Sequence, residues 1–366
     1  MGDKKIYSSF ITEELETILY AILERRNNDN IHVAPFKRYG FSGSNLYLIY
    51  FSKENRDGLP YLLKTFTDGD KAKKESEAMK LFKDKYRWAK GEEYSNSKLH
   101  GILLEAHSPD ASSEHANDPM TFKKIMYEWK NEEICELLKK MFDEFGQVYK
   151  NTTTESCNIL HSYSKYLRND ETKNIIGKLT KDNINNEKIK FFGKEIMNPV
   201  YVKKHLIKET PITKSLIHGD LHTDNIVIDH QKCPRIVDFA WACKNDIYID
   251  FSLFEMSVRY WQPSFFMSSE AKDNLEKVLL NENFDINNID TKNKDIRKMM
   301  LIVSEIRKWC RQIIGSNYDF KHHLLSQFIV LYGLQKYTDS YNPYVVIPFL
   351  AKLGKKIKEF GYVNGR

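Results

Sequence analysis

The sequence predicts an α+β protein of two lobes, in which a small lobe with a β-sheet and one key helix precedes a larger, mainly helical lobe. The first reason is length, because 366 residues exceed the usual size of one hydrophobic core. The second is pattern, because strand-like segments are concentrated before residue 105 and helical periodicity dominates the rest of the chain. We therefore expect one lobe at residues 1–105 and the other at residues 106–366.

The composition is that of a globular protein, with 41% hydrophobic and 29% charged residues. No apolar run is long enough for a membrane helix, and the N-terminus lacks the apolar run of a signal peptide. The five cysteines are scattered without a C-x-x-C pair, which predicts neither a disulfide framework nor a zinc site. A net charge of +6 is weak evidence for nucleic-acid binding at this length. We expect a cytoplasmic protein without a membrane or nucleic-acid partner, and the sequence does not indicate its oligomeric state.

The smaller lobe is predicted from five segments. An amphipathic pattern predicts a helix over residues 11–26. A glycine-punctuated turn then leads into a strand within residues 39–51, and residues 61–66 form the next strand, antiparallel to it. Residues 70–86 switch to helical periodicity, and residues 99–104 form a short apolar strand. A polar, turn-rich segment follows, and we interpret it as the linker between the lobes.

Glu75 is the unusual residue of the predicted helix over residues 70–86. It falls in the middle of a face that is otherwise apolar at 100° per residue. A buried carboxylate is costly unless it is paired, and Lys64 on the preceding strand is a suitable partner. We expect a Lys64–Glu75 ion pair; the alternative is that Glu75 lies at the edge of the buried face.

The larger lobe is predicted mainly from helical periodicity. Apolar residues recur at helical spacing between Glu132 and Tyr149, which indicates a core helix. Further helices are predicted near residues 296–314, 320–337 and 344–359. Residues 169–190 and 281–295 are rich in Asn, Asp and Lys, and we expect them to be surface insertions.

The most specific motif runs from His218 to Asn225, His-Gly-Asp-Leu-His-Thr-Asp-Asn, and Asp238 follows it after a short apolar run. Phosphoryl transfer needs in-line placement, neutralised phosphate charge and a group that orients the acceptor hydroxyl. Asp220 can bind the hydroxyl and take its proton. Asn225 and Asp238, at the two ends of a predicted hairpin, offer the oxygen ligands that Mg²⁺ prefers. Lys64 can reach nucleotide phosphates.

A second candidate for phosphate binding is the glycine turn before the first long strand. Gly40 and Gly43 allow a tight backbone turn, with Ser42 and Ser44 between and after them. Such a turn could close over phosphates, but an ordinary hairpin is the alternative.

These motifs resemble those of the aminoglycoside phosphotransferase and choline kinase group, small-molecule kinases with a bilobal protein-kinase-like fold. The group's loop, H-G-D-x-H-x-x-N, is matched at His218, Gly219, Asp220, His222 and Asn225. Its metal-binding segment is matched at Val237-Asp238-Phe239. The chain departs from the group at Thr223-Asp224, where many members have Pro-Gly, and neither change removes a functional group.

The resemblance implies a role for each matched residue. Asp220 would be the catalytic base, Asn225 and Asp238 the Mg²⁺ ligands, and Lys64 with Glu75 the phosphate-positioning pair. The hinge that receives the nucleotide base would be Leu104, Glu105 and Ala106, in a segment from Leu103 to His107. His218, His222 and Asp250 would support the loop, although Asp250 could equally be a helix N-cap.

The expected activity is Mg²⁺-dependent transfer of the γ-phosphoryl group of ATP or GTP to a hydroxyl of a small molecule. Residues 211–290 contain seven Lys and Arg but thirteen Asp and Glu, which suits a cationic acceptor such as an amino sugar, an aminocyclitol or a choline-like molecule. The alternative reading of these acids is that they are solvated or cap helices. Two alternative functions are a protein or lipid kinase, against which no A-P-E-like element follows Asp238, and an inactive nucleotide-binding scaffold.

Overall fold

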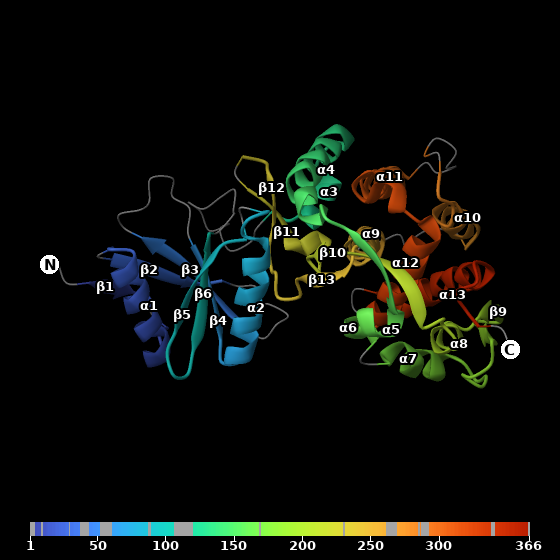
Figure 1. Cartoon of the computed structure of the whole chain (residues 1–366), viewed down its shortest axis with the longest axis horizontal. Coiled ribbons are helices and arrows are strands. Elements are labelled where there is room, and N and C mark those ends of the chain that lie inside the picture. The colour runs from blue at the N-terminus through green and yellow to red at the C-terminus, as the bar shows by residue number, and fades with distance from the viewer. Residues whose placement is uncertain are drawn as a thin grey trace.

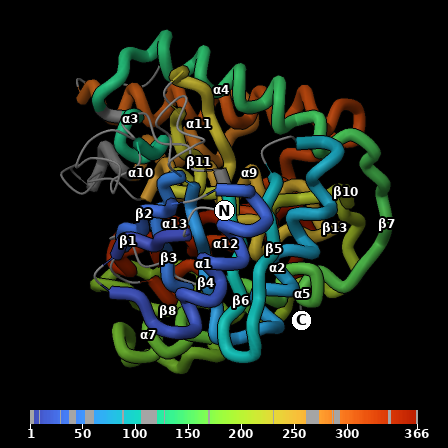
Figure 2. Tube along the Cα trace, turned by 90° about the vertical axis from the view of Figure 1, so that its left-hand side faces the viewer, coloured from blue at the N-terminus to red at the C-terminus, as the bar shows by residue number. Residues whose placement is uncertain are grey.

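The computed structural model describes residues 4–8, 10–28, 30–36, 44–51, 61–86, 89–105, 120–167, 170–229, 231–260, 269–284, 286, 293–337 and 341–364. A sheet-rich N-terminal part and a mainly helical C-terminal part lie at opposite ends of the view in Figure 1. Viewed from the N-terminal side, the sheet and its helices lie in front, and the long helices α4 and α11, Asn131–Phe145 and Lys294–Ile314, run above them (Figure 2). No helix among the described residues is both long and apolar enough to cross a membrane.

The N-terminal part is built on one six-stranded sheet with the order β1-β2-β3-β4-β6-β5. The β1–β2 pair is parallel, and the other pairs are antiparallel. The strands are β1 Lys5–Tyr7, β2 Asn30–Pro35, β3 Asn45–Phe51, β4 Tyr61–Phe66, β5 Gly91–Ser95 and β6 His100–Glu105. The helices are α1 Glu13–Arg25 and α2 Gly69–Phe82.

The alternation of β4 directs its side chains to two different helices. Leu63 belongs to the apolar cluster that also contains the buried face of α1. The next residue, Lys64, points to the opposite face, where α2 supplies Glu75. Figure 1 shows α2 between the sheet and the hairpin of β11 (Ile226–Ile228) and β12 (Pro234–Ile236). The two-residue period of a strand therefore decides that Lys64 faces the rest of the molecule.

The remainder of the chain is mostly helical, with three small sheets. β10 pairs antiparallel with both β7 and β13, and β11–β12 and β8–β9 are two-stranded. The remaining strands are β7 Thr153–Asn158, β8 Lys188–Phe191, β9 Lys194–Met197, β10 Glu209–Ile217 and β13 Cys243–Asp246. The remaining helices are α3 Phe122–Glu128, α5 Ile159–Ser162, α6 Ser164–Leu167, α7 Glu171–Leu179, α8 Pro199–Lys204, α9 Tyr248–Tyr260, α10 Ser269–Leu279, α12 Phe320–Leu334 and α13 Pro343–Glu359, with 3₁₀ turns at Gly146–Tyr149, Thr223–Asn225 and Gly315–Asn317.

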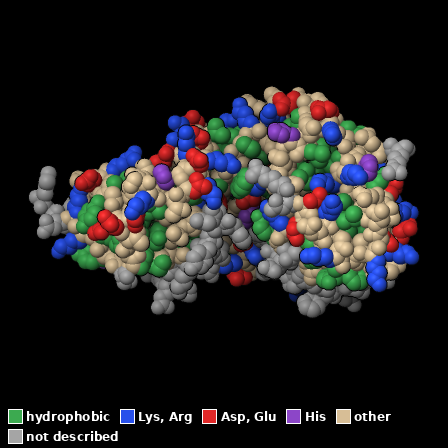
Figure 3. Space-filling model, turned by 90° about the horizontal axis from the view of Figure 1, so that it is seen from below, with side chains coloured by type: hydrophobic (Ala, Val, Ile, Leu, Met, Phe, Trp, Pro, Cys, Tyr) green, Lys and Arg blue, Asp and Glu red, His purple; other side chains and the backbone are tan. Residues whose placement is uncertain are grey.

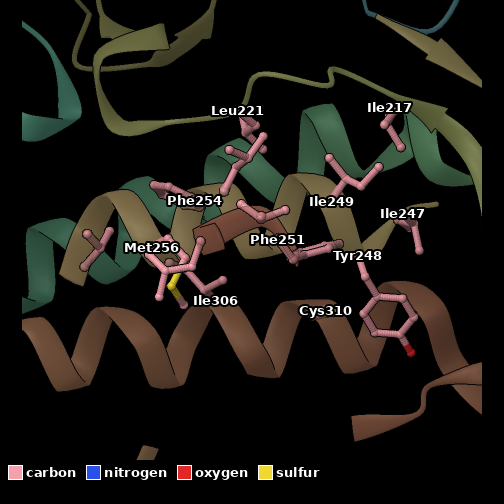
Figure 4. Packing of buried hydrophobic residues seen from close by; sticks show 14 of the residues in the cluster. Ile217, Leu221, Ile247, Tyr248, Ile249, Phe251, Phe254, Met256, Ile306 and Cys310 are labelled. Atoms are coloured by element: carbon pink, nitrogen blue, oxygen red, sulfur yellow. The ribbon is translucent and has the colours of Figure 1, made fainter. Parts of the chain in front are cut away.

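The helix α9 is the centre of the C-terminal core. All of its residues are buried, which fits a helix that is packed on every side. Figure 4 shows Leu221 lying towards Phe254 of α9, with Ile306 of α11 on the other side of the helix. The loop that contains Leu221 thus rests on a rigid apolar helix.

The predicted helices before residue 150 and after residue 296 are confirmed, with ends that differ by a few residues. The strands predicted at residues 61–66 and 99–104 are confirmed as β4 and β6, and the hairpin as β11–β12. The prediction of a surface insertion at residues 169–190 was wrong in part. This segment contains α7 and β8, and Ile176 and Ile189 are buried against Ile347 of α13 in a small apolar cluster.

Candidate active site

The loop from His218 to Asn225 is held between a strand and a hairpin. It leaves the end of β10 and enters β11 directly. The amide of Val237 donates to the carbonyl of Asn225 at 3.0 Å, which extends the β11–β12 pairing by one step. Asn225 and Asp238 are therefore brought near each other by hairpin register, although the sequence separates them.

Asp250, in the first turn of α9, anchors the backbone of this loop. Its carboxylate accepts hydrogen bonds from the amides of His218 and Gly219, each at 2.7 Å, and from the hydroxyl of Tyr149 at 2.8 Å. Burial raises the pKa of Asp250 to about 6, although these donors oppose the shift. The helix N-cap alternative is not what the structure shows, because the carboxylate caps the loop instead of the helix.

His218 is buried and connects the loop to the segment after the hairpin. Burial lowers its pKa to about 4, so the ring is neutral at pH 7. The amide of Asp220 donates to Nδ1 at 3.3 Å, so Nε2 carries the proton and donates to the carbonyl of Val237 at 3.0 Å. This neutral ring therefore ties the backbone amide of Asp220 to the carbonyl of Val237, the residue before Asp238.

Lys64, on β4, contacts two carboxylates, one on α2 and one in the segment that follows the β11–β12 hairpin. Its ammonium lies 2.9 and 2.8 Å from the two oxygens of Glu75 and 3.1 Å from Oδ1 of Asp238. Burial acts to lower the pKa of Lys64, but Asp238 and Glu75 outweigh it and raise the pKa above its usual value. Burial also raises the pKa of Glu75, and Lys64 opposes that shift. Because both Glu75 oxygens contact the ammonium, we assign the charged pair that the sequence predicts.

Asn225 and Asp238, whose backbones hairpin register brings near each other, carry side-chain oxygens of the type that Mg²⁺ prefers. The amide nitrogen of Asn225 donates to the carbonyl of Asp220 at 2.9 Å, so its position is fixed by the loop itself. Asp238 has a φ of +67°, a left-handed conformation that a non-glycine residue adopts only when its surroundings impose it. Its side chain is 33% exposed, so a ligand can reach it.

The carboxylate of Asp220 has a partner that the sequence did not predict. The ammonium of Lys165, in α6, lies 2.9 Å from Oδ1 of Asp220 and 2.6 Å from the carbonyl of Gly219. Burial acts to raise the pKa of Asp220, but Lys165 outweighs it, and the net shift is below the usual value. Asp220 is therefore ionised at neutral pH, as a proton acceptor must be.

His222 is bonded to the loop backbone. Its Nδ1 accepts from the amide of Asp224 at 3.3 Å, and its Nε2 lies 3.8 Å from Oδ2 of Asp220. Both contacts lie within the loop from His218 to Asn225, where His222 is predicted to have a supporting role.

A pocket of about 410 Å³ adjoins the loop on the side of Lys165. Its wall includes Gly219, Lys165 and Trp241, the third residue after Asp238. The ammonium of Lys165 lies 4.3 Å from the centre of the Trp241 ring, and that of Lys74, the neighbour of Glu75 in α2, lies 4.4 Å from it. One indole ring thus contacts residues beside both Asp220 and Glu75.

The remaining predicted residues are placed as follows. Ser44 is buried just before β3, and Leu104 and Glu105 end β6 beside Leu62 and Tyr61 of β4. Gly40, Ser42, Gly43 and Ala106 lie outside the described residues, as does His107. Lys165 was missed because Tyr163-Ser-Lys-Tyr166 matches no motif and only folding brings it to Asp220.

Residues 178–271, less than half of the chain, match the family model described as the phosphotransferase enzyme family. The matched region contains Asp220, Asn225 and Asp238, and the match confirms the resemblance found in the sequence and the predicted phosphotransferase class. No curated protein sequence matches the chain.

Several solved structures are similar to the chain. The aminoglycoside phosphotransferase APH(4)-Ia is 9% identical, with a TM-score of 0.48 and coverage of 93% of this chain and 98% of that one. A choline kinase from Cryptosporidium parvum Iowa II is 10% identical, with a TM-score of 0.46 and coverage of 95% and 97%. A putative fructosamine-3-kinase from Thermobifida fusca is 10% identical, with a TM-score of 0.46 and coverage of 89% and 93%.

Proposed function

We propose that this protein transfers the γ-phosphoryl group of ATP or GTP to a hydroxyl of a small molecule in a Mg²⁺-dependent reaction. We assign nucleotide binding to an N-terminal lobe, residues 1–105, and catalysis and acceptor binding to a C-terminal lobe, residues 106–366, in a bilobal kinase-like arrangement. Its five cysteines are free thiols, which suits a reducing compartment such as the cytoplasm.

The observation that carries the proposal is the contact of Lys64 with both Glu75 and Asp238. It places a sheet lysine next to a candidate metal ligand, and hairpin register places that ligand beside the loop of Asp220. A lysine, two metal-ligand oxygens and a proton acceptor are the groups that phosphoryl transfer requires.

In the proposed reaction Asp220 binds the acceptor hydroxyl and takes its proton as the oxygen attacks the γ-phosphorus. The bond between that phosphorus and the oxygen bridging to the β-phosphate breaks, and the nucleoside diphosphate leaves with this oxygen. Lys64 holds the phosphates in place. Asn225 and Asp238 would hold Mg²⁺, which would neutralise phosphate charge.

Three features of the site favour the binding of such an ion. Asp238 is held in a left-handed conformation, and its carboxylate is partly exposed and faces the cationic Lys64. Asn225 is tied to the backbone of Asp220. The two donors flank the β11–β12 hairpin, whose register holds their backbones near each other.

The test is a screen of small-molecule acceptors that measures ADP or GDP release and product formation. Asp220→Asn serves as the blank, and we expect it to bind nucleotide while transfer falls by orders of magnitude. Asp143→Asn, an exposed position in α4, is the matched control and should keep full activity. Full transfer by Asp220→Asn would exclude Asp220 as the base, and nucleotide binding without transfer to any acceptor would favour the scaffold alternative.

A further inference from the structure

We propose that the pocket beside Asp220 binds an anionic group of the acceptor and that Lys165 is the specificity-determining residue that holds this group. The inference rests on the proposed function for the fate of the hydroxyl, but anion binding in the pocket can be measured without any transfer. The ligand chemistry is a hydroxyl-bearing carboxylate or phosphate ester.

The charged lining of the pocket is basic. Its walls come from β7, β10, β13 and the α5–α6 segment, and its charged side chains are Lys165, Lys214, Lys244 and Glu155. Glu155 is already engaged, because its carboxylate lies 2.6 Å from the ammonium of Lys214. Lys165, whose partner Asp220 is not among the lining residues, and Lys244 therefore leave the lining itself with a positive excess. On the surface face in Figure 3, by contrast, acidic and basic side chains intermingle.

Lys165 connects the pocket to Asp220. Its ammonium has three N–H groups, of which the carbonyl of Gly219 and the carboxylate of Asp220 occupy two. The side chain is 20% exposed and lines the pocket, so the third N–H can serve a ligand. An anionic oxygen bonded at about 2.8 Å would lie within about 6 Å of Oδ1 of Asp220. A hydroxyl a few bonds from that group would reach the base.

The energetics of Lys165 favour an anion. Burial lowers the pKa of Lys165 although Asp220 opposes the shift, so the ammonium is held in surroundings that solvate it poorly. When Asp220 takes the proton of the acceptor hydroxyl, its carboxylate loses the negative charge that neutralises Lys165. An anionic group of the acceptor would then neutralise Lys165 in its place. A cationic group at the same place would meet a like charge.

The acidic excess of residues 211–290 does not contradict an anionic acceptor, because its buried members have other partners. Asp229 pairs with Arg235, and Glu255 pairs with Arg307. Asp246 accepts hydrogen bonds from Tyr163 and His322, and Asp250 holds the loop backbone. These carboxylates are 0–5% exposed and are not part of the pocket wall. The charge count of the segment therefore does not describe its binding surface.

The first experiment measures binding by titration calorimetry at constant ionic strength, with inorganic phosphate, glucuronate and choline as probes. We expect phosphate or glucuronate to bind the wild type and Lys165→Arg, and to bind Lys165→Met at least tenfold more weakly. Lys188→Met, an exposed lysine paired with Glu195 on β9, is the matched control and should bind like the wild type. Phosphate that bound at Lys64 instead would bind Lys165→Met as tightly as the wild type. Equal binding by the wild type and Lys165→Met, no binding of either anion, or preferred binding of choline would overturn the proposal.

The second experiment compares four acceptors with a common ring: glucose, glucosamine, glucuronate and glucose 6-phosphate. We expect the wild type to prefer one of the two anionic sugars by at least tenfold in kcat/KM, and the preferred one distinguishes a carboxylate from a phosphate site. Lys165→Met should lose this preference and Lys165→Arg should retain much of it. An equal fall in kcat for all four acceptors would instead assign Lys165 to the transferred phosphoryl group. Lys165-dependent binding without transfer would count against the proposed function only.

Discussion

The ammonium of Lys64 and the carboxylate of Asp238 lie 3.1 Å apart, although 174 positions separate them in the chain. The same ammonium contacts Glu75 of α2, so three elements meet at one charge. Two carboxylates around one buried lysine leave a net negative charge, which is suited to a divalent cation and its phosphates. This contact makes the positions of the sheet and the hairpin interdependent.

Replacing Lys64 by Met should weaken nucleotide binding and destabilise the fold. The variant leaves the 2% exposed side chain of Glu75 without its cation, and an uncompensated buried charge costs about 3–5 kcal/mol. The double variant Lys64→Met/Glu75→Gln removes that charge and should recover most of the stability but none of the affinity. Urea unfolding and nucleotide titration of both variants separate the two effects. Lys73→Met, at an exposed position of α2, should change neither quantity.

Asp238→Asn should keep the fold and lose Mg²⁺-dependent transfer. Asn tolerates the left-handed backbone that Asp238 adopts, so strain does not increase. The variant retains one oxygen but loses the negative charge that binds the cation, and we expect at least a hundredfold fall in kcat/KM at limiting Mg²⁺. Transfer rates measured across a Mg²⁺ titration, with Asp84→Asn at an exposed turn as the control, check this. An unchanged Mg²⁺ dependence would remove Asp238 from the metal site.

Gly219→Ala should be far more damaging than Gly193→Ala. Both glycines have a left-handed φ, +72° and +78°, so both substitutions incur about 1–2 kcal/mol of backbone strain. At Gly219 the added Cβ would also lie 2.3 Å from the carbonyl oxygen of Trp241, whereas at Gly193 it meets no described atom within 4 Å. The midpoint temperature of thermal unfolding and the transfer rate should both fall for Gly219→Ala. For Gly193→Ala only the midpoint temperature should fall, and slightly. Similar losses at the two positions would mean that strain dominates.

His323→Gln should change the pH dependence of stability. Burial lowers the pKa of His323 to about 4, although Glu255 opposes the shift, and its unfolded value is about 6.5. A depressed folded pKa gives stability that is complete above pH 6.5 and is lost as the pH falls toward 4. The destabilisation caused by His323→Gln should therefore shrink by about 1 kcal/mol between pH 7.5 and 5.5.

The measurement for His323→Gln is urea unfolding at pH 7.5, 6.5 and 5.5. A constant difference for His323→Gln would show that its ring is not held neutral by the fold.

Sequence alone was sufficient where a single element carries the information. The apolar face of α2 with Glu75 in its middle predicted an ion pair, because a buried charge needs a partner and Lys64 was on the preceding strand. The short apolar run after Asn225 predicted the hairpin that joins Asn225 to Asp238. These features depend on helical and strand periods and on short-range register, which the order of residues determines.

Tertiary structure alone decided the partners that come from distant elements. Nothing near Lys165 in the chain indicates that its ammonium contacts Asp220, since α6 reaches the loop only through packing in the helical part. The charge count of residues 211–290 likewise suggested a cationic acceptor, but folding buries several of those carboxylates in internal pairs. The sequence determines which groups exist and how they are spaced locally. Which charges meet, and which remain for a ligand, depends on long-range packing, because burial sets the cost of leaving any one of them unpaired.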